Sequence, residues 1–287
     1  MARPVDPAIR EALVERVRFY RDLGLTEFYR RPVDPVLLAQ LHAETNEPQT
    51  LGAPDLVQQG VEIRETNPQP ASQEDHPIPP RKPFSAPPAI AAAVPAAERA
   101  AALQLIRDEI GDCTRCALHA GRNKLVFGDG DAAARLMFVG EGPGADEDAQ
   151  GLPFVGRAGQ LLNNMIAAMG LSREQVYIAN VVKCRPPGNR TPEPEEGNTC
   201  SQFLFRQIDV VRPQVLVALG ATAATYLLGA RQPLAGLRGR VHAFRGTKLI
   251  ITYHPAYLLR DPRQKKEAWA DLQIAMHELG LKPSAKG

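Results

Sequence analysis

Short apolar runs alternate with longer amphipathic stretches through the C-terminal two thirds of the chain. Four of these runs predict buried strands, at residues 136–139, 176–179, 215–219 and 249–252. Helical spacing predicts helices before, between and after them, at 96–110, 156–169, 195–211, 221–228 and 265–279. Because strands that alternate with helices favour a parallel sheet covered on both faces, we expect an α/β fold with three α/β/α layers and a central four-stranded parallel sheet.

Unusual loops follow the predicted strands. They begin at Gly140, Asn180, Gly220 and His254, each at or next to a strand end. In a parallel sheet, ligands bind in the crevice outside the carboxyl ends of the strands. We therefore expect the functional residues to meet at that edge of the sheet.

The first third of the chain has a different pattern. Residues 1–47 carry helically spaced apolar positions, which predict a small N-terminal helical element. Residues 48–95 hold eleven of the 26 prolines and a single aromatic residue, Phe84. Such a segment buries too little apolar surface to offset the entropy of ordering, so it predicts a flexible linker. The folded domain is expected at 96–287.

The formal net charge of +2 conceals an uneven distribution. Residues 96–287 carry 24 basic and 19 acidic side chains, a balance of +5. From Arg206 to Lys266 there are eleven basic residues against only Asp209 and Asp261. A run of one sign suits a polyanionic partner such as nucleic acid, although a solvated basic face explains it equally well.

No segment of the sequence predicts a membrane protein. The N-terminus lacks the apolar core of a signal peptide, and the longest uncharged apolar stretch, 215–230, is 16 residues long and is interrupted by Gly220. A membrane span needs about 20 apolar residues. We therefore expect an intracellular protein without a membrane partner.

Four cysteines occur in the chain, at Cys113, Cys116, Cys184 and Cys200. The two thiolates of the C-x2-C pair can bind a soft metal from one turn of the chain. For all four cysteines to share one centre, the fold would have to bring together three segments, those of the pair, Cys184 and Cys200. Zinc and an iron–sulfur cluster fit this spacing about equally well, and unrelated core cysteines are a third possibility. The residues by themselves leave this choice open.

The motifs after residue 96 resemble, in their joint order and spacing, those of the iron–sulfur-containing family 4 of the uracil-DNA glycosylase superfamily. The resemblance covers about residues 97–280. Its parts are the C-x2-C pair, GEGPGADED at 140–148, GLPFVGRAG at 151–159, IANVVKCRPPGNRTP at 178–192, Cys200 and YHPAYLLR at 253–260. The resemblance implies a four-stranded parallel sheet between helices and a [4Fe–4S] cluster held by the four cysteines.

The resemblance also implies how uracil is recognised. A glycosylase must take the nucleotide out of the base stack and stabilise an oxocarbenium sugar while the base leaves as an anion. By resemblance Asn180 reads the uracil edge, because an amide matches O4 and N3–H and mismatches cytosine. Phe154 would be the stacking platform, and Gly142 would line the same site. His254 would donate to O2, where negative charge develops as the bond breaks.

Carboxylates crowd one loop, at Glu141, Asp146, Glu147 and Asp148. DNA phosphates repel such groups, so they need a chemical or structural purpose. By resemblance, Glu141 has an electrostatic or water-directing role and Glu147 lies near the C5 edge of uracil, while Asn189 approaches the sugar. Asp146 or Asp148 can instead cap a neighbouring turn, and for Asp148 we favour that interpretation.

Leu258 is an apolar residue in a stretch rich in cations. The resemblance implies that it wedges into the base stack while neighbouring cations, Arg260 and Lys265 among them, hold the DNA backbone. Core packing of a short helix is the alternative, and it applies to Leu259 as well.

The sequence therefore predicts a monofunctional uracil-DNA glycosylase of base excision repair, which hydrolyses the N-glycosidic bond in single- or double-stranded DNA and leaves an abasic site. The alternatives are a uracil-DNA binding protein that traps its product covalently, and an inactive cluster-bearing DNA-binding module. The trapping subgroup carries an inserted basic loop with a His, and VVKCRPPGNRTPEPEE has neither. We expect a monomer in the cytoplasm, associated with the nucleoid, with a repair or replication partner bound through residues 1–95.

Overall fold

The computed structural model describes residue 84 and residues 87–281. The helical element expected at 1–47 and most of the linker expected at 48–95 lie outside the described residues. In the described part of the chain, no helix is both long and apolar enough to cross a membrane.

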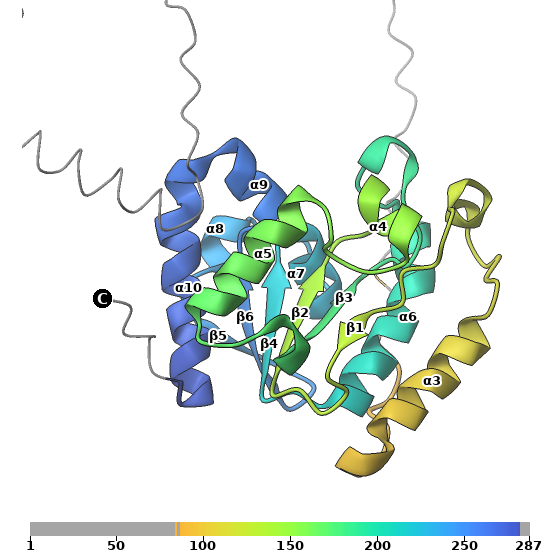
Figure 1. Cartoon of the computed structure of the whole chain (residues 1–287), viewed down its shortest axis with the longest axis horizontal. Helices are drawn as coiled ribbons and strands as arrows, with labels where there is room; N and C mark the ends of the chain where they lie inside the picture. The colour runs from red at the N-terminus through yellow and green to blue at the C-terminus, as the bar shows by residue number, and fades with distance from the viewer. Residues whose placement is uncertain (1–83, 85–86, 282–287) are drawn as a thin grey trace, which may run out of the picture. The chain divides into compact units, whose positions relative to one another are not determined.

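The centre of the fold is a sheet whose described part has six strands in the order β1-β3-β2-β4-β6-β5 (Figure 1). The four inner strands run parallel, as predicted. They are β2 Leu136–Gly140, β3 Tyr177–Asn180, β4 Val215–Leu219 and β6 Thr247–Thr252. Short antiparallel strands close both edges, β1 Asp129–Gly130 beside β3 and β5 Val241–Phe244 beside β6.

The two edge strands correct the predicted count of four strands. β1 has two residues, too few to produce a periodic signal. β5 forms a hairpin with β6, and the two residues between them, Arg245 and Gly246, have φ values of 51° and 78°. Positive φ at both central residues is typical of a tight hairpin turn, which Asn-Gly or Asp-Gly usually announces. Because arginine occupies the first of these two positions, the residue types do not indicate a hairpin here.

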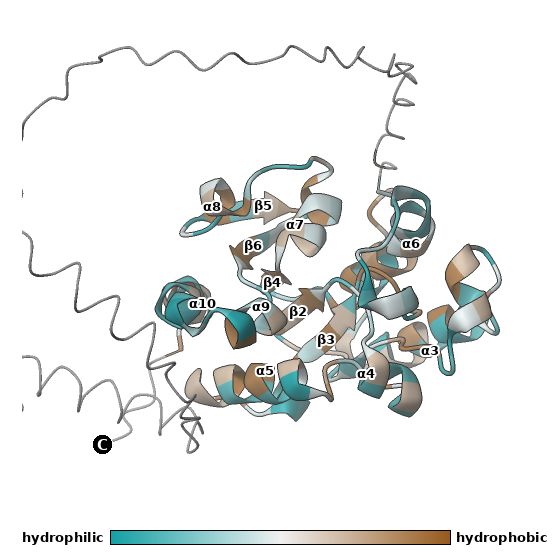
Figure 2. Cartoon of the chain, turned by 90° about the horizontal axis from the view of Figure 1, so that it is seen from above, coloured by the Kyte–Doolittle hydropathy of each residue, from teal (hydrophilic) through white to brown (hydrophobic). Residues whose placement is uncertain are grey.

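Helices cover both faces of the sheet and make the three predicted layers (Figure 2). Alternate side chains of β2 enter two separate cores, Met137 and Val139 on one face and Leu136 and Phe138 on the other. The first face packs against α3 Arg99–Ile110, α6 Pro194–Val211, α7 Ala221–Leu228 and α8 Leu234–Leu237. The second packs against α5 Arg157–Ala168, α9 Pro255–Arg260 and α10 Lys265–Leu279.

Two stretches expected as loops contain short helices. α4 Ala145–Gln150 lies within GEGPGADEDAQ, and α9 lies within YHPAYLLR. Each has six residues, too few for a helical period to be recognised in the sequence. Short 3₁₀ turns occupy Ala96–Glu98, Ala117–Gly121, Arg173–Gln175, Pro187–Asn189 and Pro262–Gln264.

The last residues of the predicted linker contact the folded domain. Phe84 packs edge-to-face against Tyr226, with ring centroids 5.3 Å apart. Arg245 donates a hydrogen bond to the backbone carbonyl of Pro88 at 2.7 Å and pairs with the buried carboxylate of Asp209. Phe84 and Pro88, which lie within the predicted linker, thus contact the folded domain. Composition gives no sign of partners that distant segments supply.

Candidate active site

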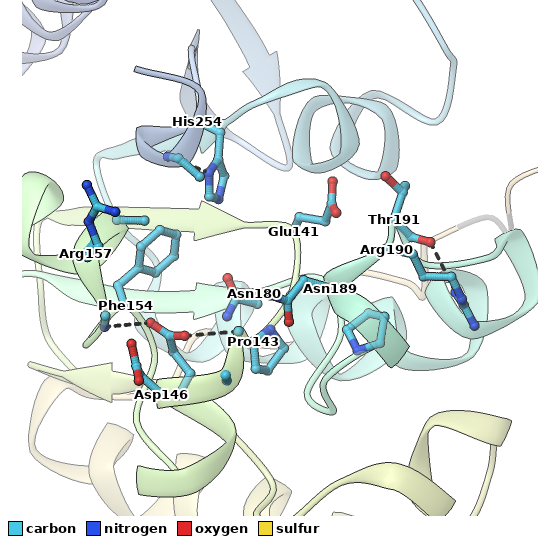
Figure 3. A pocket seen from close by; sticks show the side chains of 18 of the residues that line it. Glu141, Pro143, Asp146, Phe154, Arg157, Asn180, Asn189, Arg190, Thr191 and His254 are labelled. Carbon is cyan, nitrogen blue, oxygen red and sulfur yellow. Dashed lines mark hydrogen bonds between the residues drawn. The ribbon is translucent and has the colours of Figure 1, made fainter. Parts of the chain in front are cut away.

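A cavity of about 550 Å³ lies at the carboxyl ends of the parallel strands, where the predicted topology places the crevice (Figure 3). Its walls come from the loops after β2, β3 and β6 and from the segment leading into α5. The predicted site residues that line it are Glu141, Gly142, Glu147, Phe154, Asn180, Asn189, His254 and Arg260. The fold thus brings residues from four separate motifs together.

Asn180 lies deep in this cavity, as the last residue of β3 and in register with Gly140 of β2. It is 2% exposed, and among the described residues its side-chain oxygen Oδ1 has no hydrogen-bond partner. Gly140 makes room for it, since a Cβ there would meet that oxygen and lie 2.6 Å from the Phe154 ring. Because an unpaired buried acceptor is unfavourable, Asn180 indicates a ligand that supplies an N–H group.

Phe154 lies beside Asn180 with a strained backbone. Its φ is 52°, a left-handed value, and the residue is buried. The guanidinium of Arg173 holds this loop by donating to the carbonyls of Pro153 and Phe154, at 2.6 and 3.2 Å. The Phe154 ring centroid lies 5.5 Å from that of His254. Such strain persists where the surroundings determine it and clusters at functional sites, which fits a ring held in place for a ligand.

His254 follows β6 and caps the N-terminus of α9. Its Nδ1 accepts the backbone N–H of Ala256 at 3.1 Å, which places the ring proton of the neutral form on Nε2. Burial, with Arg260 as a weaker cause, lowers the pKa of His254 to about 4. The imidazole is therefore neutral near pH 7 and offers the cavity one N–H donor.

Glu141 is held by a residue that the sequence analysis missed. The hydroxyl of Thr222 donates a hydrogen bond to Glu141 Oε2. Thr222 lies in the first turn of α7, where the helix N-terminus favours a nearby carboxylate. The only signal in the sequence was its place two residues after the strand-end loop at Gly220.

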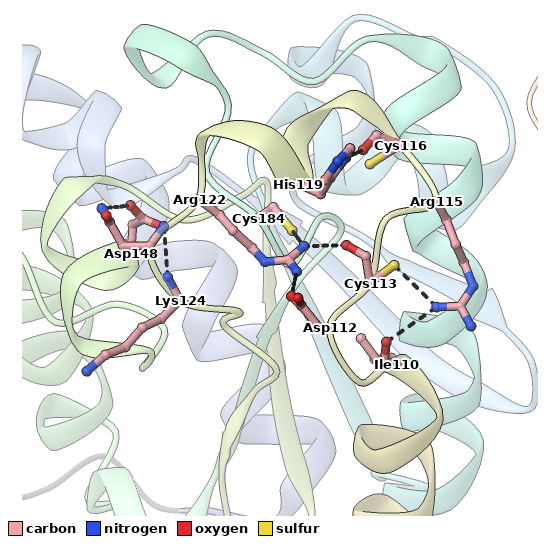
Figure 4. Close-up of polar contacts among 11 residues, drawn as sticks. Ile110, Asp112, Cys113, Arg115, Cys116, His119, Arg122, Lys124, Asp148 and Cys184 are labelled. Carbon is pink, nitrogen blue, oxygen red and sulfur yellow. Dashed lines mark hydrogen bonds and ion pairs between the residues drawn. The ribbon is translucent and has the colours of Figure 1, made fainter.

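Glu147 and Asp148 are both bound by backbone groups. Glu147 accepts three N–H groups, from Gly144 at 3.0 Å and from Val155 and Gly156 at 2.9 Å each. It thereby ties α4 to the loop that carries Phe154. Asp148 is fully buried and accepts the backbone N–H of Asn123 at 2.9 Å (Figure 4). Asp148 thus binds a neighbouring loop, in line with the favoured structural interpretation.

Gly142 and Asn189 line the cavity from the loops after β2 and β3. A Cβ at Gly142 would lie 2.7 Å from Cγ2 of Val182, so glycine lets these two segments approach. Asn189 has a left-handed backbone, with φ at 57°, and its side-chain oxygen accepts a hydrogen bond from Arg185 at 2.7 Å. Their expected roles stay predictions.

Two of the residues predicted to contact DNA are buried in this structure. Leu258 is 1% exposed and packs in the core, which is the alternative that the sequence left open for this leucine. Lys265 is 7% exposed, and burial lowers the pKa of its ammonium. Arg260 is exposed at the cavity, and Arg157, which was not predicted, joins it there. Each helix turns one face inward, and a run of charges does not show which face that is.

Residues 127–273 match the family model described as the uracil DNA glycosylase superfamily. The match spans slightly more than half of the chain and includes every wall of the cavity. The chain belongs to the uracil DNA glycosylase superfamily.

Within that superfamily the chain is similar to type-4 uracil-DNA glycosylases, which confirms the resemblance read from its motifs. The protein of Thermotoga maritima is 48% identical over 161 residues, which are 55% of this chain and 84% of the relative. That of Archaeoglobus fulgidus is 43% identical over 173 residues, 58% and 87% of the two chains. That of Saccharolobus solfataricus is 41% identical over 190 residues, 63% and 88%.

The cysteines of this superfamily member meet at a second place, a small cavity lined by Cys113, Cys116, Cys184 and Cys200. The fold thus joins the three segments that the spacing required. Among the described residues, no group of three or more His, Cys, Asp or Glu side chains is arranged around a single metal ion.

The cysteine sulfurs accept hydrogen bonds from nearby N–H groups. Arg115 donates to Cys113 at 3.2 Å, and Arg122 donates to Cys184 at 3.4 Å (Figure 4). The backbone N–H of Lys183 donates to Cys200 at 3.3 Å. Sulfurs that receive N–H groups are typical of iron–sulfur ligands, whose properties depend on such bonds. In their chemistry, the four thiols and their N–H donors therefore agree with the iron–sulfur cluster that the resemblance implies.

Proposed function

We propose that the chain is a uracil-DNA glycosylase that hydrolyses the N-glycosidic bond of deoxyuridine in single- or double-stranded DNA and leaves an abasic site for repair. Its superfamily and its similarity to type-4 enzymes support this activity. Asn180 is the observation that carries the proposal, because a buried amide oxygen without a partner in the described structure lines a cavity at the strand ends.

An extruded uracil fits the groups in this cavity. Phe154 would stack on the base, while Asn180 would accept N3–H through Oδ1 and donate its amide N–H to O4. Cytosine carries an acceptor at N3 and an amino group at C4, so both contacts would mismatch. The recognition of uracil thus rests on one amide whose orientation the protein fixes.

Bond cleavage leaves a negative charge on the base and a positive charge on the sugar. The neutral His254 would donate its Nε2–H to O2, where the negative charge develops. Glu141, held by Thr222, would stabilise the oxocarbenium and orient the water that attacks C1′. Asn189 would contact the sugar from the neighbouring loop.

Glu147 would act near the C5 edge of uracil chiefly through the loops it binds. Both of its carboxylate oxygens accept backbone N–H groups, so the side chain fixes the wall of the cavity beside Phe154. A 5-methyl group would have to fit against this wall, and a fixed wall excludes it better than a pliable one.

DNA contact would come from exposed cations at the cavity rim. Arg157 and Arg260 line the opening and would bind phosphates. We propose that the active form is a monomer in the cytoplasm, associated with the nucleoid. Residues 1–95 would bind a repair or replication partner.

Cys113, Cys116, Cys184 and Cys200 would hold a [4Fe–4S] cluster. When bound, it supplies iron–thiolate cross-links between three segments, one of which leads directly from Asn180. Purified protein should be brown with broad visible absorption, and Cys184→Ala should lose both colour and iron. A colourless protein that contains zinc would contradict this assignment.

The activity is tested with a labelled oligonucleotide that contains one uracil. After incubation, alkali cleaves the strand wherever the base has been removed. Strand scission and free uracil over many turnovers support the enzyme. A stoichiometric adduct that survives denaturation would instead show the product-trapping protein, and unchanged DNA would overturn both.

A further inference from the structure

Lys183 lies between the uracil cavity and the cysteine site, with its ammonium inside the protein. It is 1% exposed and stands directly before Cys184 in the chain. Its Nζ donates to the backbone carbonyl of Asn180 at 2.9 Å and to Oε1 of Gln207 at 2.5 Å. Among the described residues, its Nζ makes no hydrogen bond to a carboxylate, and the centroid of the Phe127 ring lies 6.0 Å from it.

A buried ammonium without a carboxylate partner is unfavourable for stability. An unbranched apolar side chain of similar length would fill the same space without having to lose its hydration. Packing therefore does not explain why a lysine stands at this position. The two oxygens that accept hydrogen bonds from its ammonium are both held in fixed positions.

The surrounding hydrogen bonds fix the ammonium from two sides. Gln207 is fully buried on α6, and its Nε2 donates to the carbonyl of Phe127 and the hydroxyl of Tyr177, each at 3.1 Å. These bonds direct its Oε1 at Lys183. The backbone N–H of Lys183 donates to the sulfur of Cys200. One residue thus joins the end of β3 to both α6 and the cysteine site.

We infer that Lys183 is a positioning residue for uracil recognition: its ammonium holds the backbone of Asn180, and its backbone N–H ties the same turn to the cysteine site. The direction of the Asn180 side chain follows from its backbone, and a charged donor restrains a carbonyl more strongly than a neutral one. The inference rests on the proposed function, because it gives Asn180 the task of reading the base.

The test is a double-mutant cycle in the full-length, iron-loaded protein. Lys183→Met should lower kcat/KM on a uracil oligonucleotide on the order of tenfold to a hundredfold, as expected for a lost charge-assisted hydrogen bond. In an Asn180→Ala background the same change should lower it no further, because both act through one amide. Thr247→Val is the matched control, since it removes a different buried hydrogen bond, from the Thr247 hydroxyl to the Pro213 carbonyl, and leaves every contact of Lys183 and Asn180 in place.

A second measurement does not depend on turnover. Binding is followed with an oligonucleotide that carries 2′-fluoro-deoxyuridine, whose glycosidic bond resists cleavage. Lys183→Met should weaken this binding towards that of a thymine oligonucleotide, whereas Thr247→Val should not. Iron per chain is measured for every variant, and if Lys183→Met fails to fold or loses iron, Gln207→Met replaces it in the same cycle.

The outcomes separate this inference from the proposed function. Wild-type activity in Lys183→Met, or an equal loss with and without Asn180, would overturn the positioning role and leave the glycosylase intact. A wild-type protein that releases no uracil would overturn the function itself.

Discussion

The Nδ1 atom of His254 accepts the backbone N–H of Ala256, two residues along the chain, at 3.1 Å. This one bond caps α9 and also sets the tautomer of the ring that lines the cavity. A protonated imidazole has no free acceptor, so protonation would break the cap. The contact and the lowered pKa of His254 thus favour the same neutral ring.

The rate of uracil release should show no ionisation of His254 near neutral pH. Because burial lowers the pKa of this residue to about 4, the ring keeps one form throughout the physiological range. The measurement is kcat against pH from about 5.5 to 8, the window in which an ordinary histidine titrates. An inflection near 6.5 that disappears in His254→Ala would contradict the prediction. That variant should itself lose about a hundredfold or more in kcat.

The same pKa predicts a pH-dependent stability. Between the ordinary pKa of 6.5 and about 4, the unfolded chain binds a proton at His254 that the folded chain does not. The free energy of unfolding should therefore fall as the pH is lowered through this window, with no such contribution above it. Denaturant unfolding of the wild type and His254→Asn at pH 7 and pH 5 checks this. Equal losses in the two proteins would assign the effect to other groups.

Gly140→Ala should damage the cavity without unfolding the protein. A Cβ at this position would meet Asn180 Oδ1 and lie 2.6 Å from the Phe154 ring, so the groups proposed to read and stack the base must shift. We expect kcat/KM to fall about tenfold to a hundredfold, the effect of losing one or two well-placed contacts. Gly236→Ala is the matched control, because a Cβ there would have no neighbour within 4 Å. Equal activity of the two variants would rule out the crowding argument.

Thr222→Val should lower activity by removing the hydrogen bond to Glu141 while keeping the shape of the side chain. A hydrogen bond to a charged group contributes about 1.5–3 kcal/mol, so kcat should fall roughly tenfold to a hundredfold. Thr222→Ser keeps the hydroxyl and should retain most of the rate. Single-turnover kinetics of both variants provide the comparison. A loss in the serine variant as large as that in the valine variant would point to packing instead.

Arg245→Met should destabilise the domain and release its N-terminal segment. Arg245 and Asp209 are both buried, and removing one member of a buried ion pair costs about 3–5 kcal/mol. The same change removes the bond to the Pro88 carbonyl, so residues 87–91 should become sensitive to protease. Arg240 is exposed, and Arg240→Met should change the free energy of unfolding by less than about 0.5 kcal/mol. Denaturant unfolding and limited proteolysis measure the two effects.

Much of the fold was predictable because its signals are local. A buried parallel strand reads as a continuous apolar run, and the four inner strands have such runs. β1 and β5 were not predictable, since two residues carry no period and a half-exposed edge strand carries no buried run. The hairpin turn at Arg245 was not predictable either, because arginine rarely adopts the positive φ that this residue has.

The sequence by itself determined the four inner strands of the sheet, the place of the site at their carboxyl ends and the motif residues that meet there, because strand ends and motif spacing are properties of the chain. Only the tertiary structure decided that Leu258 and Lys265 face inward, that Thr222 holds Glu141 and that Lys183 holds Asn180. Burial and hydrogen-bond partners depend on which distant segments pack together. A side chain can have several possible hydrogen-bond partners in the sequence. Its role is decided only when the fold brings one of these partners within reach.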